Sequence, residues 1–166
     1  MRMRGYWPIV AAALAAGCGD KHAQGGAASA GAGQPAAAAP AAAPAANGAA
    51  VFARTCQTCH QANGLGLANT FPPLAGSEIA NGEKPRLIRL VLHGMTGAVT
   101  VQGKRFNNVM PPWKSLSDAD LAAVLSYVRS SFGNSAPAVT AEEVARERAA
   151  TSSRTMPWAP ADLGLH

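Results

Sequence analysis

The segment Val51-Phe-Ala-Arg-Thr-Cys-Gln-Thr-Cys-His60 (VFARTCQTCH) places two cysteines three positions apart and a histidine directly after them. Three kinds of site use such a triplet: a redox-active dithiol, half of a zinc site, and the attachment point of a covalent haem. In a redox dithiol the pair normally follows a strand, at the N-terminus of a helix that lowers the thiol pKa. Here the pair comes at the end of a predicted helix, and no alternating strand precedes it.

A zinc site needs four protein ligands, or three and a water molecule. The other histidines are His22, His93 and His166, and no second pair at ligand spacing accompanies them. The redox dithiol therefore lacks its preceding strand, and the zinc site lacks ligands, whereas haem attachment uses all three residues of the triplet. Two thiols spaced by a helical turn match the two haem vinyl groups, and the adjacent imidazole falls on the haem face. The sequence predicts that Cys56, Cys59 and His60 hold one covalent haem c.

Haem iron has a sixth coordination position, for which Met110 in the segment NNVMPPW is the predicted ligand. Pro111 and Pro112 stiffen this segment, and Trp113 offers a large apolar wall. A methionine among apolar residues more often belongs to a hydrophobic core, which is the competing interpretation. Two other methionines are alternative ligands, Met95 among glycine-containing turns and Met156 beyond the last predicted helix of the domain.

The N-terminus has the pattern of an export signal, with a basic start followed by a short, mostly apolar run. That run is shorter than the roughly 20 apolar residues of a membrane-spanning helix. It ends in Leu14-Ala-Ala-Gly-Cys18, which resembles the lipobox of bacterial lipoproteins, although Leu14 is one place further from the cysteine than is usual. We therefore expect residues 1–17 to be a lipoprotein-type signal peptide and Cys18 to carry the lipid. The alternative is an ordinary signal peptide that contains a cysteine.

Composition divides the rest of the chain into three parts. Residues 18–47 are mostly Ala, Gly and Pro, without bulky side chains to bury, which predicts a flexible linker. Residues 48–135 are the predicted folded domain, and residues 136–166 form a C-terminal extension. The extension contains TAEEVARERAAT, which predicts a short charged helix, followed by an extended tail. It could wrap around its own domain or contact a partner.

Hydrophobic periodicity and end signals predict three helices in the domain, over residues 48–61, 83–93 and 117–133. Glycines and prolines punctuate the long loops between them. Residues 99–102 alternate too briefly to argue for a sheet. The prediction is a small all-α domain whose long loops are organised by something central, which a covalent haem would supply.

The domain carries a modest positive charge, with eight Lys and Arg against four Asp and Glu between residues 48 and 135. Lys104, Arg105 and Lys114 lie near the predicted methionine segment and could form part of a docking face for an acidic partner. An ordinary solvated loop explains them equally well. Nucleic acid is not an expected partner, because the chain is predicted to be exported and has no basic motif interleaved with aromatic residues.

Several spaced features between residues 48 and 135 resemble the class I cytochromes c, small electron carriers with one His/Met-ligated haem c. Gly48 and Phe52 precede Cys56 by eight and four residues, and the resemblance implies that they pack against Tyr127 of the last helix. The segment TFPPLAG resembles the one whose proline carbonyl accepts a hydrogen bond from the ligand histidine. The resemblance implies that Pro72 or Pro73 fixes the tautomer of His60 in this way.

The segment NNVMPPW, followed by LSDADLAAVLSYVRSSFG, resembles the methionine loop and final helix of the same family. More narrowly, the domain is similar to cytochromes that serve bacterial periplasmic dehydrogenases. The resemblance implies an electron carrier rather than an enzyme, located in the periplasm, with a dehydrogenase, an oxidase or another cytochrome as its partner. Two alternatives are a permanent subunit of an oxidoreductase complex and a haem enzyme or sensor whose methionine is displaced by a ligand.

Overall fold

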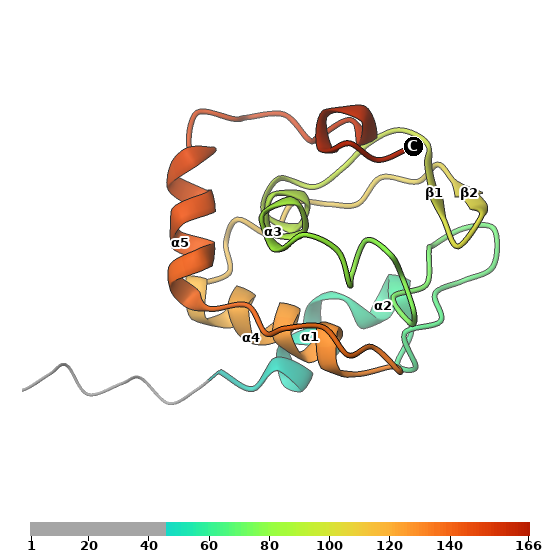
Figure 1. Cartoon of the computed structure of the whole chain (residues 1–166), viewed down its shortest axis with the longest axis horizontal. Helices are drawn as coiled ribbons and strands as arrows, with labels where there is room; N and C mark the ends of the chain where they lie inside the picture. Colours follow the sequence, from blue (N-terminus) through green and yellow to red (C-terminus); the bar gives the residue numbers. More distant parts are fainter. Residues whose placement is uncertain (1–45) are drawn as a thin grey trace, which may run out of the picture. The chain divides into compact units, whose positions relative to one another are not determined.

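The computed structural model describes residues 46–166. The predicted signal peptide, Cys18 and nearly all of the predicted linker lie outside the described residues. The elements are α1 (Gly48–Thr55), α2 (Gln57–His60), α3 (Lys84–His93), β1 (Val99–Val101), β2 (Lys104–Phe106), α4 (Asp118–Ser130), α5 (Ala141–Ala150) and a 3₁₀ turn, η1 (Pro160–Leu163) (Figure 1). None of the helices in this part of the chain has the length and apolar character that crossing a membrane requires.

Helices α1 and α4 cross at a point of close backbone approach. A Cβ atom on Gly48 would overlap the Ala123 carbonyl oxygen and lie 2.8 Å from the Tyr127 Cβ atom. One turn further along α1, the Phe52 ring lies 5.6 Å from the Tyr127 ring and 5.2 Å from the Phe132 ring, between centroids. The predicted packing of Phe52 against Tyr127 is therefore confirmed, and α1 is fixed on α4 just before the two cysteines.

The predicted helices are present, with two differences at their ends. The first helix is interrupted at Cys56, which separates α1 from the single turn of α2. The last helix of the domain begins as predicted, with the Ser117 side chain accepting a hydrogen bond from the Asp120 amide, but it ends at Ser130 rather than at residue 133. Phe132 has a positive φ of 58°, which turns the chain out of the helix and directs this ring back onto Phe52.

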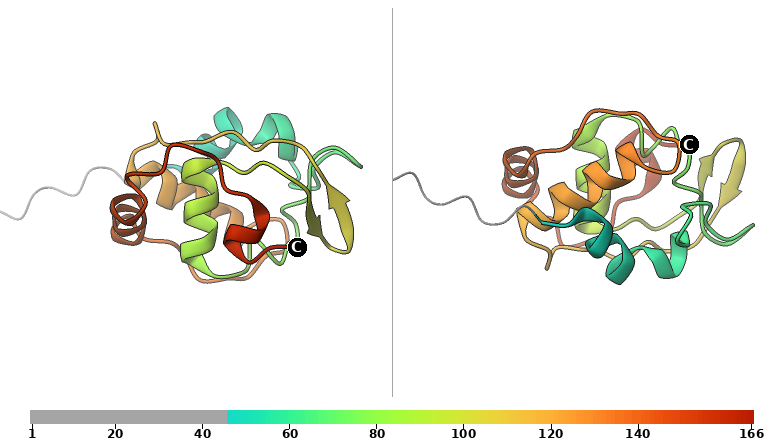
Figure 2. Two further views of the ribbon diagram at one scale, coloured as in Figure 1. Left: turned by 90° about the horizontal axis from the view of Figure 1, so that it is seen from above. Right: turned by 90° about the horizontal axis from the view of Figure 1, so that it is seen from below.

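Strands β1 and β2 form a short antiparallel hairpin, which the sequence did not predict. Val99, Val101 and Phe106 are buried on its inner face, and the turn is made by Gln102 and Gly103, both with positive φ. Burial of the alternate residues explains why so short a pairing persists. Figure 2 shows the hairpin at the end of the domain opposite to α5.

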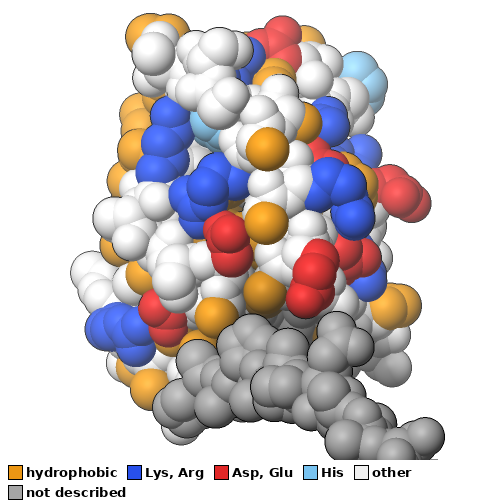
Figure 3. Space-filling model, turned by 90° about the vertical axis from the view of Figure 1, so that its left-hand side faces the viewer, with side chains coloured by type: hydrophobic (Ala, Val, Ile, Leu, Met, Phe, Trp, Pro, Cys, Tyr) orange, Lys and Arg blue, Asp and Glu red, His pale blue; other side chains and the backbone are white. Residues whose placement is uncertain are grey.

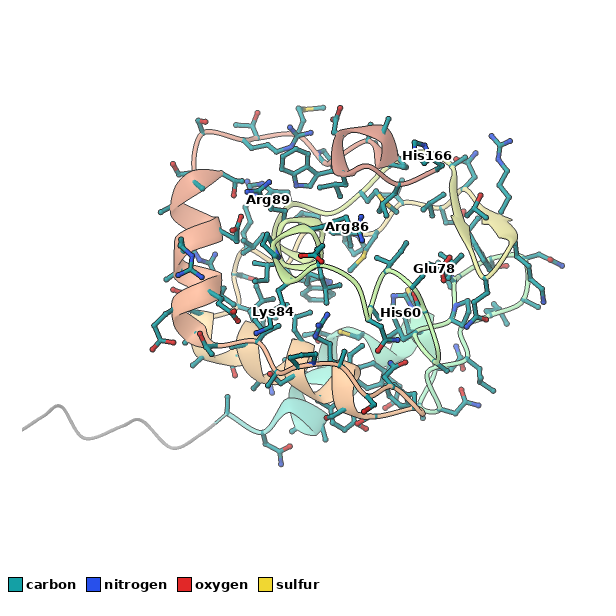
Figure 4. All side chains as sticks on the ribbon, in the orientation of Figure 1. His60, Glu78, Lys84, Arg86, Arg89 and His166 are labelled. Atoms are coloured by element: carbon teal, nitrogen blue, oxygen red, sulfur yellow. The ribbon has the colours of Figure 1, made fainter. Side chains whose placement is uncertain are left out.

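The C-terminal extension (residues 136–166) packs on its own domain. Val139, Val144, Leu163 and Leu165 join the hydrophobic core, and helix α5 lies against both α3 and α4. Lys84 and Arg89 of α3 form ion pairs with Glu143 and Glu147 of α5, at 3.0 and 2.6 Å (Figure 4). On the α5 side of the molecule, basic and acidic side chains lie next to one another rather than in separate patches (Figure 3).

Candidate haem site

A cavity of about 370 Å³ lies inside the domain and is lined mainly by apolar side chains. Among those that line it are Leu87, Leu90 and Val91 of α3, Val99 of β1, and Val124 and Val128 of α4. The predicted site residues Cys56, Cys59, His60, Pro72, Pro73, Met110 and Trp113 all border the same cavity. The fold therefore brings together residues that are up to 57 positions apart in the sequence.

Cys56 and Cys59 lie on one tight turn. The amides of Cys59 and His60 both donate hydrogen bonds to the Cys56 carbonyl, at 3.2 and 2.9 Å. Both cysteines are half-buried and free rather than joined in a disulfide. Burial raises the pKa of the Cys56 thiol, and a contact of 3.2 Å with the Thr55 hydroxyl opposes that shift. The raised pKa of Cys56, and an apolar space bordered by both sulfur atoms, are unlike the surroundings of an activated dithiol.

The imidazole of His60 is oriented by the main chain of the following loop. Its Nδ1 atom lies 3.0 Å from the Pro72 carbonyl oxygen, which can only accept a hydrogen bond, so Nδ1 carries the proton. Burial lowers the pKa of His60, and the hydrogen bond to Pro72 opposes this shift only in part. The ring is therefore neutral at physiological pH with a lone pair on Nε2, which is the form that binds metals. Of the two candidate prolines, Pro72 makes this contact.

Met110 and Met95 both border the cavity and lie opposite each other on an antiparallel bridge. Next to them, the Trp113 amide donates a hydrogen bond to the carbonyl of Val91 at 3.0 Å, which fixes the methionine loop (residues 107–116) on α3. Met156 does not border the cavity, and its side chain is 68% exposed. The structure thus brings two of the three candidate methionines to the cavity.

The three cations considered as one docking face are separated in the fold. Lys104 and Arg105 lie on β2, at one end of the domain. Lys114 instead donates a hydrogen bond to the Arg154 carbonyl at 2.7 Å, in the part of the C-terminal extension that follows α5. The methionine loop runs from the hairpin towards α5 between these residues (Figure 1). The three cations therefore flank this loop, and their part in docking a partner stays a prediction.

Two polar residues that the sequence reasoning did not single out hold the loop that carries Pro72. Asn134 accepts hydrogen bonds from the Gly76 amide and the Asn81 side chain, and donates to the Leu74 and Val128 carbonyls. Arg129, only 2% exposed, donates to the carbonyls of Ala80, Gly82 and Pro137. For Arg129 the sequence did hold a signal, since this residue falls on the side of the predicted helix that faces the core. A buried guanidinium must find hydrogen-bond acceptors, which would have predicted bonds to a neighbouring loop.

The cavity and its donors fit a haem c. An apolar interior suits a porphyrin, two free thiols on one turn suit thioether attachment, and a neutral imidazole with a fixed tautomer and a nearby thioether suit iron. Within residues 46–166, no group of three or more His, Cys, Asp and Glu side chains could hold a metal ion directly. A zinc site built from the cysteines and His60 therefore lacks a further ligand among these residues.

Comparison with known proteins agrees with this interpretation. The model of the cytochrome c family matches residues 45–132. Cytochrome c-552 of Thermus thermophilus is 39% identical over 113 residues, which cover 63% of this chain and 86% of that protein. The cytochrome c subunit of alcohol dehydrogenase (quinone) from Gluconacetobacter polyoxogenes is 37% identical over 105 residues, covering 61% of this chain and 22% of that subunit.

The gluconate 2-dehydrogenase cytochrome c subunit of Pantoea cypripedii is 38% identical over 106 residues, which cover 61% of this chain and 24% of that subunit. Together with the helical fold around an apolar cavity, these matches identify the prosthetic group as well as the family. This chain belongs to the cytochrome c family, has the class I fold, and binds a covalent haem c.

Proposed function

We propose that this protein is a periplasmic one-electron carrier, in which Cys56 and Cys59 would attach the haem and His60 and Met110 would bind its iron. The observation that carries the proposal is the meeting of all four side chains at one apolar cavity. Haem c supplies the redox chemistry, since its iron changes between the ferric and ferrous states by one electron.

The protein's own residues act by holding the site unchanged while the electron arrives and leaves. The Pro72 carbonyl keeps the His60 ring in one orientation, and Pro111 and Pro112 stiffen the chain directly after Met110. A thioether ligand and an apolar cavity both favour the ferrous state, which raises the reduction potential relative to a bis-histidine haem. Because His60 and Met110 would both bind the iron, they would leave no place on it for a substrate, which supports a carrier rather than an enzyme.

Met110 is favoured over Met95 as the ligand for two reasons. It lies in a loop stiffened by two prolines. Met95 is instead buried, and the residues on either side of it, Gly94 and Thr96, are hydrogen-bonded to Trp158 of the extension. Met95 is thus placed as a packing residue of the cavity wall, a usual role for this flexible side chain.

The electron partners are redox proteins, for which the names of the relatives suggest a class. Several of them are cytochrome subunits of dehydrogenases, and these support a dehydrogenase as donor or as a permanent host complex. The match over 86% of Thermus cytochrome c-552 favours a separate carrier, because that relative consists mostly of this one domain. An oxidase or a second cytochrome is then the acceptor.

Location follows from the N-terminus. The signal-like leader and the Leu14-Ala-Ala-Gly-Cys18 segment support export and a lipid on Cys18, followed by an Ala/Gly/Pro-rich linker. Replacing Cys18→Ser should release the mature protein from membranes into the periplasmic fraction and reduce its mass by that of the lipid. Unchanged membrane association and mass in that variant would contradict the lipid anchor.

The electron-carrier proposal is tested on the full chain produced with its haem in a bacterial periplasm. Mass spectrometry under denaturing conditions should show one haem per chain that remains attached. The ferric protein should show the near-infrared charge-transfer band of methionine ligation, the ferrous protein should not bind carbon monoxide, and a redox titration should follow a single one-electron curve. Rapid carbon monoxide binding by the native ferrous protein would instead support a ligand-binding enzyme or sensor.

A further inference from the structure

The C-terminal extension contacts the cavity wall that carries the two methionines. The Trp158 amide donates a hydrogen bond to the Gly94 carbonyl at 3.0 Å, and the Thr96 amide donates to the Trp158 carbonyl at 2.9 Å. On its other side, Met95 exchanges two main-chain hydrogen bonds with Met110. Trp158, Met95 and Met110 therefore lie side by side on three bonded segments, with the extension as the outer one.

Close packing at Gly94 makes these segments one unit. Gly94 has a φ of 73°, and a Cβ atom there would overlap the Met110 carbonyl oxygen and lie 2.9 Å from the Pro112 nitrogen. The Trp158 indole also donates to the Arg89 carbonyl of α3 at 3.0 Å, which holds the extension on the same helix end. The segment to which Met110 is bonded is therefore held on its other side by the extension.

Arg148 of α5 holds the far end of the methionine loop and the start of α4. Its Nη1 and Nη2 atoms donate to the carbonyls of Lys114 and Leu116, each at 2.8 Å, and its Nε atom donates to an Asp118 carboxylate oxygen at 2.8 Å. All three guanidinium nitrogens of one side chain thus bind a stretch of five residues. Charge-assisted hydrogen bonds from a planar, forked donor are among the stronger ones in proteins.

We propose that the C-terminal extension keeps Met110 on the haem iron, with Arg148 as the main positioning residue. This inference rests on the proposed ligation by Met110. When the methionine loop opens locally, a competing ligand can take the vacated position, and the population of the open form sets the apparent affinity for that ligand. Because Arg148 bonds the loop only in the closed form, its removal should raise the open population while the haem and both cysteines stay in place.

The test is imidazole binding to the ferric holoprotein, full length, at a temperature well below unfolding. In Arg148→Leu the apparent dissociation constant for imidazole should fall by about tenfold, the equivalent of one charge-assisted hydrogen bond. The near-infrared methionine band should disappear at correspondingly lower imidazole concentrations. Arg148→Lys keeps the charge but not the fork, so its dissociation constant should lie between those of the wild type and Arg148→Leu. It provides the measurement if Arg148→Leu does not mature.

The matched control is Lys84→Met, which removes an ion pair between α3 and the same helix α5 without touching the methionine loop. Its imidazole affinity should remain within about twofold of the wild type, because only contacts to the loop enter the opening equilibrium. Equal affinities in Arg148→Leu and the wild type, or an equal rise in Lys84→Met, would overturn the inference. If instead the methionine band survives in Met110→Ala, the ligand assignment fails and not the role of Arg148 alone.

Discussion

Met95 and Met110 face each other across an antiparallel bridge, in which the Met95 amide lies 3.0 Å from the Met110 carbonyl and the Met110 amide 2.9 Å from the Met95 carbonyl. Directly opposite residues of such a pair direct their side chains to the same side. Two thioethers consequently border one cavity, although the sequence separates them by 15 positions. The relationship makes each methionine the natural control for the other.

Replacing Met110→Ala should abolish the near-infrared methionine band of the ferric protein and allow carbon monoxide to bind the ferrous protein. The reason is the loss of the proposed sixth ligand. The reduction potential should fall, because the thioether no longer favours the ferrous state. Absorption spectra and a redox titration of the purified holoprotein measure all three changes.

Met95→Leu is the matched control, since it keeps the volume of the cavity wall and removes only the sulfur. Its methionine band and its response to carbon monoxide should equal those of the wild type, and stability should fall by less than about 1.5 kcal/mol. The opposite pattern, a lost band in Met95→Leu and an intact one in Met110→Ala, would reassign the ligand to Met95.

Gly48→Ala should destabilise the folded protein through the crossing of α1 and α4. The added Cβ atom would overlap the Ala123 carbonyl, so the two helices must separate, at a cost of about 1–3 kcal/mol. For a domain of about 100 residues, each kcal/mol lowers the melting temperature by roughly 4–8 °C. Ala49→Ser, at an exposed position of the same helix, should leave the melting temperature nearly unchanged.

The parts of this molecule that the sequence predicted are those in which chemistry or spacing is local. The Cys-x-x-Cys-His turn and the Ser117 cap depend on residue types at fixed offsets. The pairing of Phe52 with Tyr127, 75 positions away, was expected only from the resemblance to the class I cytochromes c. The hairpin escaped prediction because its strands have three residues each and Gln102 carries no signal for its positive φ.

Long-range placement is what residue types alone could not supply. The sequence predicted a short charged helix in TAEEVARERAAT, and α5 confirms it, but the choice between wrapping the domain and contacting a partner stayed open. The hydrogen bonds of Arg148 show that the extension packs on its own domain. Their acceptors lie 30 to 34 positions away in the chain, so no local pattern could have predicted them. The same limit applies to Lys114, whose neighbours in space belong to the extension rather than to the hairpin.

Val144→Ala tests whether the extension contributes to the stability of the domain. Val144 of α5 is fully buried in the core that it shares with α3 and α4. Removing two buried carbon atoms should lower the free energy of unfolding by about 2 kcal/mol. Ala145→Ser, on the exposed side of α5, is the control. If urea unfolding gave the same midpoint for Val144→Ala as for the wild type, the extension would not be docked in solution.

His93, at the end of α3, is 4% exposed, and its hydrogen bonds define a neutral ring. The Thr151 hydroxyl donates a hydrogen bond to the Glu147 carbonyl at 2.7 Å. Because that proton is used, the Thr151 oxygen accepts a hydrogen bond from the protonated Nε2 atom of His93, also at 2.7 Å. Nδ1 is then the unprotonated nitrogen of the neutral ring. Burial lowers the pKa of His93, and the nearby cations Lys114, Arg154 and Arg148 lower it further, while a hydrogen bond to the Arg154 main chain opposes the shift only in part. The ion pair of Glu147 with Arg89 lies on the same side of α3.

The protein should therefore lose stability as the pH falls below about 6.5, the usual value for histidine. Between that value and the lowered pKa of the folded state, the unfolded chain binds a proton at His93 that the folded protein does not. The free energy of unfolding should then decrease by up to about 1.4 kcal/mol per pH unit. Denaturant unfolding of the holoprotein at pH 7, 6 and 5 measures this slope, which His93→Gln should reduce by that amount. His166→Gln, which changes an exposed histidine, should keep the wild-type slope; an equally steep decline in His93→Gln would show that the acid sensitivity arises elsewhere.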